Sequence, residues 1–396
     1  MTMVVSRATF GVTGNIVPTA VAVVSRLFWG GALLWLLATS VASILDKANL
    51  GGGMARSQLT MLALGGGFVI AVVIAFFGWK ILPTFQLAIS VLSLLLIAGL
   101  IAMTFDRVDL GVALQVQDGP LISILAGAVL VFSFVGLVWA NASSDVAQNQ
   151  NPKSSGAGSM LWATFGTALP SFVLIAYGSL LAASNPTLAA GLATAPMATI
   201  AEMLPLWYPI PLIAATALSL LSGVVISIYS GTFALAALGV RSRQSLATLL
   251  VALLTLGVGY LLTQVADFSV IFTDLATTIA VPVAAWAGIF AAEVMIRNRR
   301  YDAASLVRAG GVYPAVRWTN LIALVVITGV GFGLTSSTVS WLSWQGYIAT
   351  PFGVPVLSDL ADANVGVLLA LVAGLLVPIL GGVKAIRRQE ATEAPN

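Results

Sequence analysis

The chain has 396 residues, of which 59% are hydrophobic and only 8% are charged, and its mean hydropathy is +1.03. A soluble core does not need so much apolar surface, so the composition predicts an all-α polytopic membrane protein. The sequence contains no cysteine and no histidine, which excludes disulfides, thiolate chemistry and imidazole metal ligands. The basic residues are dispersed among short loops, which argues against a nucleic-acid partner and leaves the lipid bilayer as the expected surroundings.

Ten apolar segments are long enough to cross a bilayer as helices. They cover residues 17–45, 58–79, 84–104, 121–140, 159–184, 209–237, 245–263, 269–296, 317–342 and 364–383. The outer loop 185–208 has an apolar, helix-like middle that would lie on the outer surface or re-enter the membrane. The polar residues 389–396 predict a disordered tail.

The basic residues predict the orientation. If the spans alternate from a cytoplasmic N-terminus, most basic residues fall on the inner side, in agreement with the positive-inside rule. The inner group is Arg7, Lys80, Lys153, Arg241, Arg243, Arg297, Arg299, Arg300, Arg308, Arg317, Lys384, Arg387 and Arg388; the outer group is Lys47, Arg56 and Arg107. We therefore expect a multi-pass protein of the cell membrane with both termini in the cytoplasm.

The fourth span, 121–140, is uncharged, yet small residues recur in it and polar residues follow it as far as Asp145. Gly136 weakens the helix locally, and the hydroxyl and amide groups beyond it can satisfy freed backbone groups. We expect this span to open near its middle, which is where secondary transporters place their substrate. The alternative is a tightly packed helix with Trp139 at the membrane interface.

Few ionisable side chains fall at membrane depth, and each is a functional candidate. The sequence predicts that Arg26, in the first span, extends to the inner interface. Asp274 lies near the outer end of the eighth span. Glu293 and Arg297 are four residues apart near its inner end, where they would pair on one helix face. Asp145 would gate the inner side, pair with a basic loop or be solvated.

Two further patterns have both a packing interpretation and a binding interpretation. Hydroxyls recur along one face of the sixth span and either pack against another helix or coordinate a small cation. They belong to Thr216, Ser219, Ser222, Ser227 and Ser230. In the first span Trp29 precedes two glycines, so its indole either fills the core or offers its face to a flat ligand. No GxxxxGK[ST] pattern and no paired acids on one helix face occur, which argues against direct ATP use and against an enzyme.

Five runs of the sequence carry a family resemblance. They are SRATFGVTGN (6–15), WANASSD (139–145), ISIYSGTFALAALG (226–239), VPVAAWAGIFAAEVMIRNRRYD (281–302) and GGVYPAVRWTNLIAL (310–324). In combination they resemble the nucleobase:cation symporter family, in its purine–cytosine permease branch.

The resemblance implies an inverted-repeat transporter of five plus five helices followed by two more, of the LeuT-like fold. It implies import of a nucleobase, such as cytosine or a purine, coupled to a sodium ion or a proton, with no other cofactor. Residues 1–388 would form one membrane domain, with 17–104 as the remainder of the first repeat, 121–297 as the second repeat and 317–383 as the two additional helices.

Carried onto this chain, the resemblance places a stacking role on Trp29 and a second aromatic or backbone contact in the neighbourhood of Phe134 and Gly136. Ser227 stands where the family has an asparagine, and Ser222 falls on one of the hydroxyl ligands of the sodium site. Ser219 and Asp274 are further candidates for cation binding or coupling.

The departures from the family pattern bear on substrate and ion. Leu33 stands where the family has an amide, Leu221 where it has the other sodium-site hydroxyl, and Gln148 where it has an arginine after Asp145. These changes predict weak or no sodium dependence. They leave Asp145, Asp274 and Glu293 as the acidic residues for proton coupling.

The ten spans correspond to the family's helices three to twelve, so we expect the chain to begin at an internal methionine of a longer protein. A genuinely shortened gene is the alternative. Two other functions stay open: a transporter of the same fold for another small solute, such as an amino acid, and a truncated membrane protein that does not transport. The sequence does not predict the oligomeric state.

Overall fold

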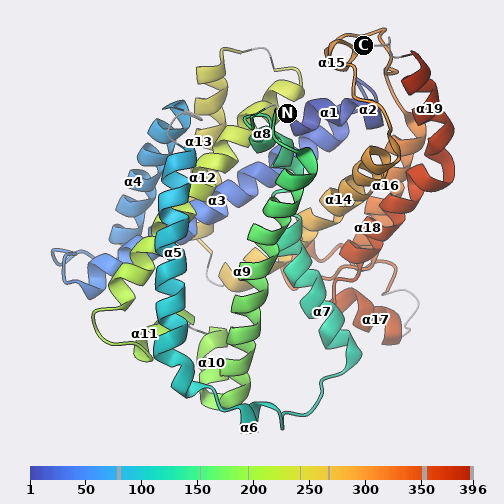
Figure 1. Ribbon diagram of the computed structural model, residues 1–396. Helices are drawn as coiled ribbons and strands as arrows, with labels where there is room; N and C mark the ends of the chain where they lie inside the picture. The colour runs from blue at the N-terminus through green and yellow to red at the C-terminus, as the bar shows by residue number, and fades with distance from the viewer. Residues whose placement is uncertain are drawn as a thin grey trace.

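The computed structural model describes residues 1–77, 82–151, 153–194, 196–240, 242–265, 268–349 and 355–392 (Figure 1). Within these ranges the secondary structure is helical throughout, and nine helices are long and apolar enough to cross a membrane. Lys80 and Arg241, two members of the predicted inner basic group, lie outside the described residues. The expected polytopic helical architecture is confirmed.

The long helices are α3 (Ile16–Lys47), α4 (Arg56–Phe77), α5 (Leu82–Thr104), α7 (Leu121–Val131), α9 (Gly156–Ser184), α12 (Pro209–Ala237), α13 (Gln244–Thr263), α14 (Phe268–Ile296), α16 (Trp318–Gly333) and α18 (Gly366–Val377). The short ones are α1 (Thr2–Val5), α2 (Arg7–Phe10), α6 (Leu110–Ala113), α8 (Ser143–Ala147), α10 (Pro186–Thr194), α11 (Pro196–Glu202), α15 (Ala303–Val307), α17 (Pro355–Asp362) and α19 (Val383–Thr392). Helices α1 and α19, near the two ends of the chain, lie at the same end of the bundle (Figure 1).

Helices α3, α12 and α14 form the centre of the bundle. Of the most apolar stretch of each, 56% is buried, against 11% for α5 and 6% for α9. One apolar cluster joins α3 to α4, α12 and α13, and a second joins α14 to α16 and α18. The side chains that meet in the interior therefore come mainly from α3, α12 and α14, which makes these helices the frame of any internal site.

Helices α14 and α18 approach each other at the level of their backbones. A Cβ atom added to Gly288 would lie 2.4 Å from the carbonyl oxygen of Leu371, and one added to Gly374 would lie 2.6 Å from that of Ala285. Small residues permit such contact in membrane bundles, where dispersion forces and close packing replace the hydrophobic effect.

Two predicted boundaries need correction. The predicted span 317–342 is too long, because α16 ends at Gly333 and the following turn is held by Asp274, which accepts hydrogen bonds from the backbone of Thr338 and Val339. The predicted disordered tail is wrong for residues 389–392, which belong to α19, whereas 393–396 lie outside the described residues.

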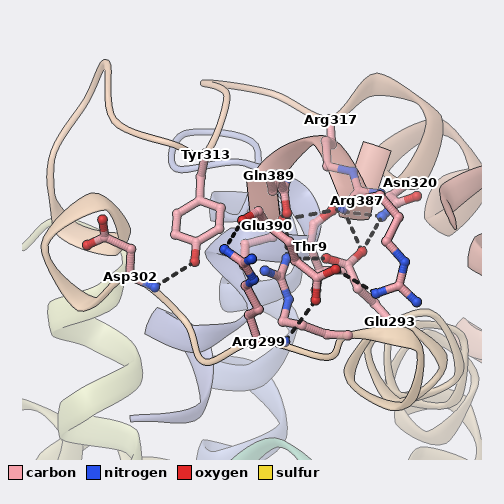
Figure 2. A network of polar contacts seen from close by, with 12 residues as sticks. Thr9, Glu293, Arg299, Asp302, Tyr313, Arg317, Asn320, Arg387, Gln389 and Glu390 are labelled. Atoms are coloured by element: carbon pink, nitrogen blue, oxygen red, sulfur yellow. Dashed lines mark hydrogen bonds and ion pairs between the residues drawn. The ribbon is translucent and has the colours of Figure 1, made fainter. Parts of the chain in front are cut away.

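A polar network joins the ends of several helices at the end of the bundle where α1 and α19 lie (Figure 2). At its centre Glu293 is fully buried and accepts a hydrogen bond of 2.6 Å from Nη1 of Arg317. The expected pair with Arg297 is present at 3.6 Å. Asn320 links the same carboxylate, at 3.4 Å, to the carbonyl oxygen of Thr9, at 2.7 Å. The network thus connects the N-terminal segment to α14 and α16.

The same region anchors α19 (Figure 2). Glu390 is 5% exposed and accepts hydrogen bonds from the backbone N–H groups of Asn298 and Arg299. It also forms an ion pair of 2.6 Å with Arg387. A carboxylate that satisfies two backbone donors at the end of α14 explains why this polar stretch folds as a helix and is not a free tail.

Candidate functional site

The fourth span breaks in the interior of the protein. After α7 the chain forms a π-helical turn over Phe132–Gly136, in which the N–H of Leu137 donates to the carbonyl oxygen of Phe132 at 3.0 Å. A Cβ atom on Gly136 would lie 3.0 Å from the ring of Phe132, so glycine is what allows this ring to fold back. Regular α-helix resumes only at α8. Such π-turns are frequent at functional sites, and the predicted opening of the span is observed.

Four aromatic side chains meet beside this break. Trp29 of α3, 6% exposed, contacts Phe134 of the π-turn with ring centroids 5.6 Å apart and Phe272 of α14 at the same separation, both edge to face. Phe134 and Phe272 contact each other at 5.1 Å, and Phe28 packs against the indole at 5.1 Å. Edge-to-face contacts of this kind fix aromatic rings relative to one another. The indole faces the interior and not the lipid.

A narrow pocket adjoins the indole. It is lined by Ser25, Trp29, Ser133, Leu137 and, from α14, Ala276, Ile279, Ala280 and Val283. The hydroxyl groups of Ser25 and Ser133 are buried, and within the described part of the chain neither has a hydrogen-bond partner. Buried hydroxyls normally find partners, so this pocket has unsatisfied polar capacity directly beside an aromatic face.

Arg26 does not extend to the inner interface as predicted. It is 1% exposed, donates from Nη2 to the carbonyl oxygen of Val138, and places its guanidinium 4.9 Å from the ring centre of Trp139. The side chain lies ten residues into α3, about 15 Å along the helix axis. The break in the fourth span exposes a carbonyl group and an aromatic face at that depth, and these replace the interface as partners for the charge.

Asp145 lies in α8, beyond the break in the same segment, and is buried, with 3% exposure. It accepts hydrogen bonds from the hydroxyl of Ser230 at 2.6 Å and from the backbone N–H of Thr2 at 2.8 Å. Of the three expectations for this residue, solvation is therefore wrong. Its partners connect α8 to α12 and to the N-terminal segment.

Ser227 and Leu33 both face the α3–α12 interface. A Cβ atom on Gly30 would lie 3.2 Å from Cβ of Ser227, which places this fully buried serine against the backbone next to Trp29. Leu33 packs on Gly223, where an added Cβ would approach its side chain to 2.8 Å. Ser227 is thus close to the aromatic cluster, whereas Leu33 makes an apolar helix contact one turn away.

Two other hydroxyls of α12, those of Ser219 and Ser222, contact α5. Ser222 accepts a hydrogen bond of 2.9 Å from the amide of Gln86, and the hydroxyls of Ser219 and Ser93 lie 3.0 Å apart. Leu221 is 6% exposed and belongs to an apolar cluster. This arrangement agrees with the packing interpretation of the hydroxyl stripe.

Asp274 is also engaged in structure. Its Oδ2 atom accepts hydrogen bonds from the hydroxyl of Ser337 at 2.7 Å and from Thr338 and Val339 in the turn after α16. From its place in the first part of α14, Asp274 therefore holds the turn that follows α16, and it is separate from the serines of α12.

Sequence reasoning missed three residues of the site. Ser25 stands four residues before Trp29, a spacing that places both on one helix face, so its position was available from the pattern. Ser133 is a small polar residue inside the span that was expected to open, so its position was also visible in the sequence. Phe272 carried none, because nothing in the sequence pairs α14 with the fourth span at that level.

A bundle of apolar helices in which one span breaks beside buried aromatic rings is the arrangement found in secondary transporters. The sequence profile of the permeases for cytosine/purines, uracil, thiamine and allantoin matches residues 1–360, and the chain belongs to this family. None of the curated proteins compared with the chain matches it.

Two solved structures share the fold. One is Mhp1, a nucleobase-cation-symport-1 family transporter, in a closed conformation with bromovinylhydantoin bound; it has a TM-score of 0.67 and 16% identity over 98% of this chain and 79% of that chain. The inward-facing conformation of Mhp1 has a TM-score of 0.59 and 18% identity over 100% of this chain and 82% of that chain. The protein is thus a multi-pass membrane transporter with the LeuT-like fold expected from the resemblance.

Proposed function

We propose that this transporter imports a nucleobase or a closely related planar heterocycle across the cell membrane, by alternating access coupled to a cation. The observation that carries the proposal is the Trp29 indole, buried at the break of the fourth span and framed by Phe134 and Phe272. Stacking of a base on an aromatic side chain contributes about 1–3 kcal/mol. The membership of the chain in a family of heterocycle permeases supports the same substrate class.

Binding at this position requires a change of side-chain conformation. In the present arrangement Phe134 and Phe272 occupy the space beside the indole, with their centroids 5.1 Å apart. A heterocycle reaches the indole face when one of these rings rotates away. Ser227, close by at Gly30, is the proposed polar contact for the edge of the base, because a hydroxyl both donates and accepts.

We infer the coupling ion from which polar groups remain available to bind a cation. The Ser219 and Ser222 hydroxyls are used against α5, and Leu221 contributes no oxygen. We therefore propose weak or no sodium dependence and assign proton coupling to the buried carboxyl groups, Asp145 foremost because it lies on the broken span. Both termini are proposed to face the cytoplasm.

The proposal is tested by uptake into proteoliposomes that contain the purified protein. The probes are radiolabelled cytosine, uracil and hypoxanthine, with leucine and glutamate as representatives of the alternative amino-acid substrates. We expect saturable uptake of at least one base and none of the amino acids. In the Trp29→Ala variant the stacking energy is lost, so the affinity should fall by about 5- to 150-fold.

The matched control is Trp162→Ala, because Trp162 of α9 is 71% exposed on the outside of the bundle. This variant should transport at the wild-type affinity. Uptake by Trp29→Ala with an unchanged half-saturation concentration would refute the stacking role, and uptake of the amino acids alone would refute the substrate class.

A further inference from the structure

Arg26 carries a positive charge in the interior of the bundle without an acidic partner. It is 1% exposed, and among the described residues no carboxylate lies within ion-pair distance of it. One of its nitrogens, Nη2, donates to Val138, whereas Nε and Nη1 are buried and have no hydrogen-bond partner in the described chain. A buried, unpaired charge is costly, so such a group persists where a function needs it.

Asp145 does not form an ion pair with the buried charge of Arg26. It is the acidic residue whose charge acts on Arg26, yet it lies beyond direct pairing distance. Its two oxygens accept from Ser230 at 2.6 Å and from the backbone of Thr2 at 2.8 Å. The free N–H groups of Arg26 are therefore left to another acceptor.

The position of Arg26 relates it to the heterocycle site. It precedes Trp29 by three residues, close to one helical turn, and it follows Ser25, which lines the pocket. On the broken span its carbonyl partner, Val138, follows the pocket-lining Leu137. The guanidinium thus bridges the same two elements, α3 and the broken span, that form the pocket.

Two kinds of unpartnered polar group occur in this region. Nε and Nη1 of Arg26 only donate, whereas the hydroxyls of Ser25 and Ser133, which line the pocket, both donate and accept. The residues that line the pocket include no carboxylate. Trp139 lies against the guanidinium at 4.9 Å and so restricts the orientation of its planar fork. An arginine with free N–H groups, beside hydroxyls that can donate and a lining without a carboxylate, is complementary to an anion.

We propose that the transported heterocycle is negatively charged, either as a deprotonated ring or through a ring carboxylate, with its ring on Trp29 and its charge on Arg26. The inference rests on the proposed function, since it uses the same indole. It adds the charge of the substrate, which Arg26 selects, with Ser25 and Ser133 as further donors to the anionic oxygen.

The test measures binding by the purified full chain to two matched pairs of probes. Orotate is compared with its neutral amide, and urate with hypoxanthine, by isothermal titration calorimetry at neutral pH. The variants are Arg26→Gln, which removes the charge, and Arg26→Lys, which keeps the charge but not the planar fork. Arg56→Gln is the control, because Arg56 begins α4 and is exposed.

In the wild type we expect each anion to bind more tightly than its neutral counterpart. A charge-assisted hydrogen bond accounts for a preference of about 10- to 100-fold. Arg26→Gln should abolish this preference while neutral probes still bind, Arg26→Lys should keep part of it, and Arg56→Gln should keep all of it. The ratio of the two affinities is the readout, because a merely structural role would weaken both members of a pair.

The outcomes separate the two proposals. If neutral heterocycles bind as tightly as the anions, or if Arg26→Gln retains the anion preference, the present inference is overturned and the proposed function stands. If no heterocycle of either charge binds, the proposed function fails and this inference fails with it. The wild-type preference decides the question by itself if Arg26→Gln does not fold.

Discussion

Glu293 provides the sharpest test of how the end of the bundle that contains α1 and α19 is held together. Replacing it with glutamine removes the negative charge shared by the guanidinium groups of Arg317, at 2.6 Å, and Arg297, at 3.6 Å. The side chains of these two arginines are only 9% and 2% exposed, so water does not take over the role of the carboxylate. Glutamine fits the same space, and its effect is therefore electrostatic rather than steric.

Removal of one partner from a buried ion pair costs about 3–5 kcal/mol, because it leaves a buried charge uncompensated. The amide oxygen of glutamine still accepts one hydrogen bond, which places the expected loss in free energy of unfolding near the lower limit, about 3 kcal/mol. For a chain of this size that corresponds to a fall in Tm of about 4 °C. The chain contains no cysteine, so unfolding in detergent is followed by intrinsic tryptophan fluorescence and not by a thiol-reactive dye.

The control is Asp106→Asn, which removes an ion pair of 3.8 Å between side chains that are 74% and 58% exposed, and its Tm should not change measurably. Adding Arg317→Met to Glu293→Gln should recover part of the loss, because the unpaired charge is replaced by an apolar side chain. A Glu293→Gln protein that unfolds at the wild-type temperature would refute the claim that this carboxylate neutralises the cluster.

Three further predictions concern packing, anchoring and coupling. Gly288→Ala should lower the free energy of unfolding by about 1–3 kcal/mol in the same fluorescence assay, because its Cβ meets the Leu371 carbonyl at 2.4 Å. Gly166→Ala in α9, where no atom lies within 4 Å of the added Cβ, should not destabilise, and equal losses in both variants would contradict the close-packing argument. Glu390→Ala leaves the N–H groups of Asn298 and Arg299 without their acceptor; it should cost about 1–3 kcal/mol and make α19 accessible to limited proteolysis, and an uncleaved α19 would count against the anchoring role. Replacement of sodium by choline should leave base uptake unchanged, whereas a steep sodium dependence would show that the reading of Leu221 and Ser222 is wrong.

The sequence predicts most of the fold because apolar length is the dominant signal in a membrane protein. The span predicted at 209–237 coincides with α12, and the one at 245–263 differs from α13 by one residue. Errors occur where tertiary contacts override composition. After Arg317 the region 317–342 carries no charge and is mostly apolar, yet Asp274 holds its second half in a turn.

The site is only partly predictable for the same reason. Gly136 lies at the break and Trp29 lies at the centre of the aromatic cluster, and both can be identified from the local sequence. The position of the Arg26 side chain cannot be predicted from local patterns. It donates to the carbonyl group of Val138, which becomes available only because another span breaks. Likewise Arg317, the nearest partner of Glu293, is 24 residues away and stands directly before a different helix, α16.

The backbone contact between α14 and α18 has a consequence for movement. Gly288 and Gly374 leave no side-chain layer between the two helices that would let one slide along the other. Helix α14 also supplies Phe272 and the pocket wall around Ala280. We therefore expect α14 and α18 to move together when the pocket widens on that side. A cross-link that immobilises α18 should then stop transport, although α18 does not line the pocket.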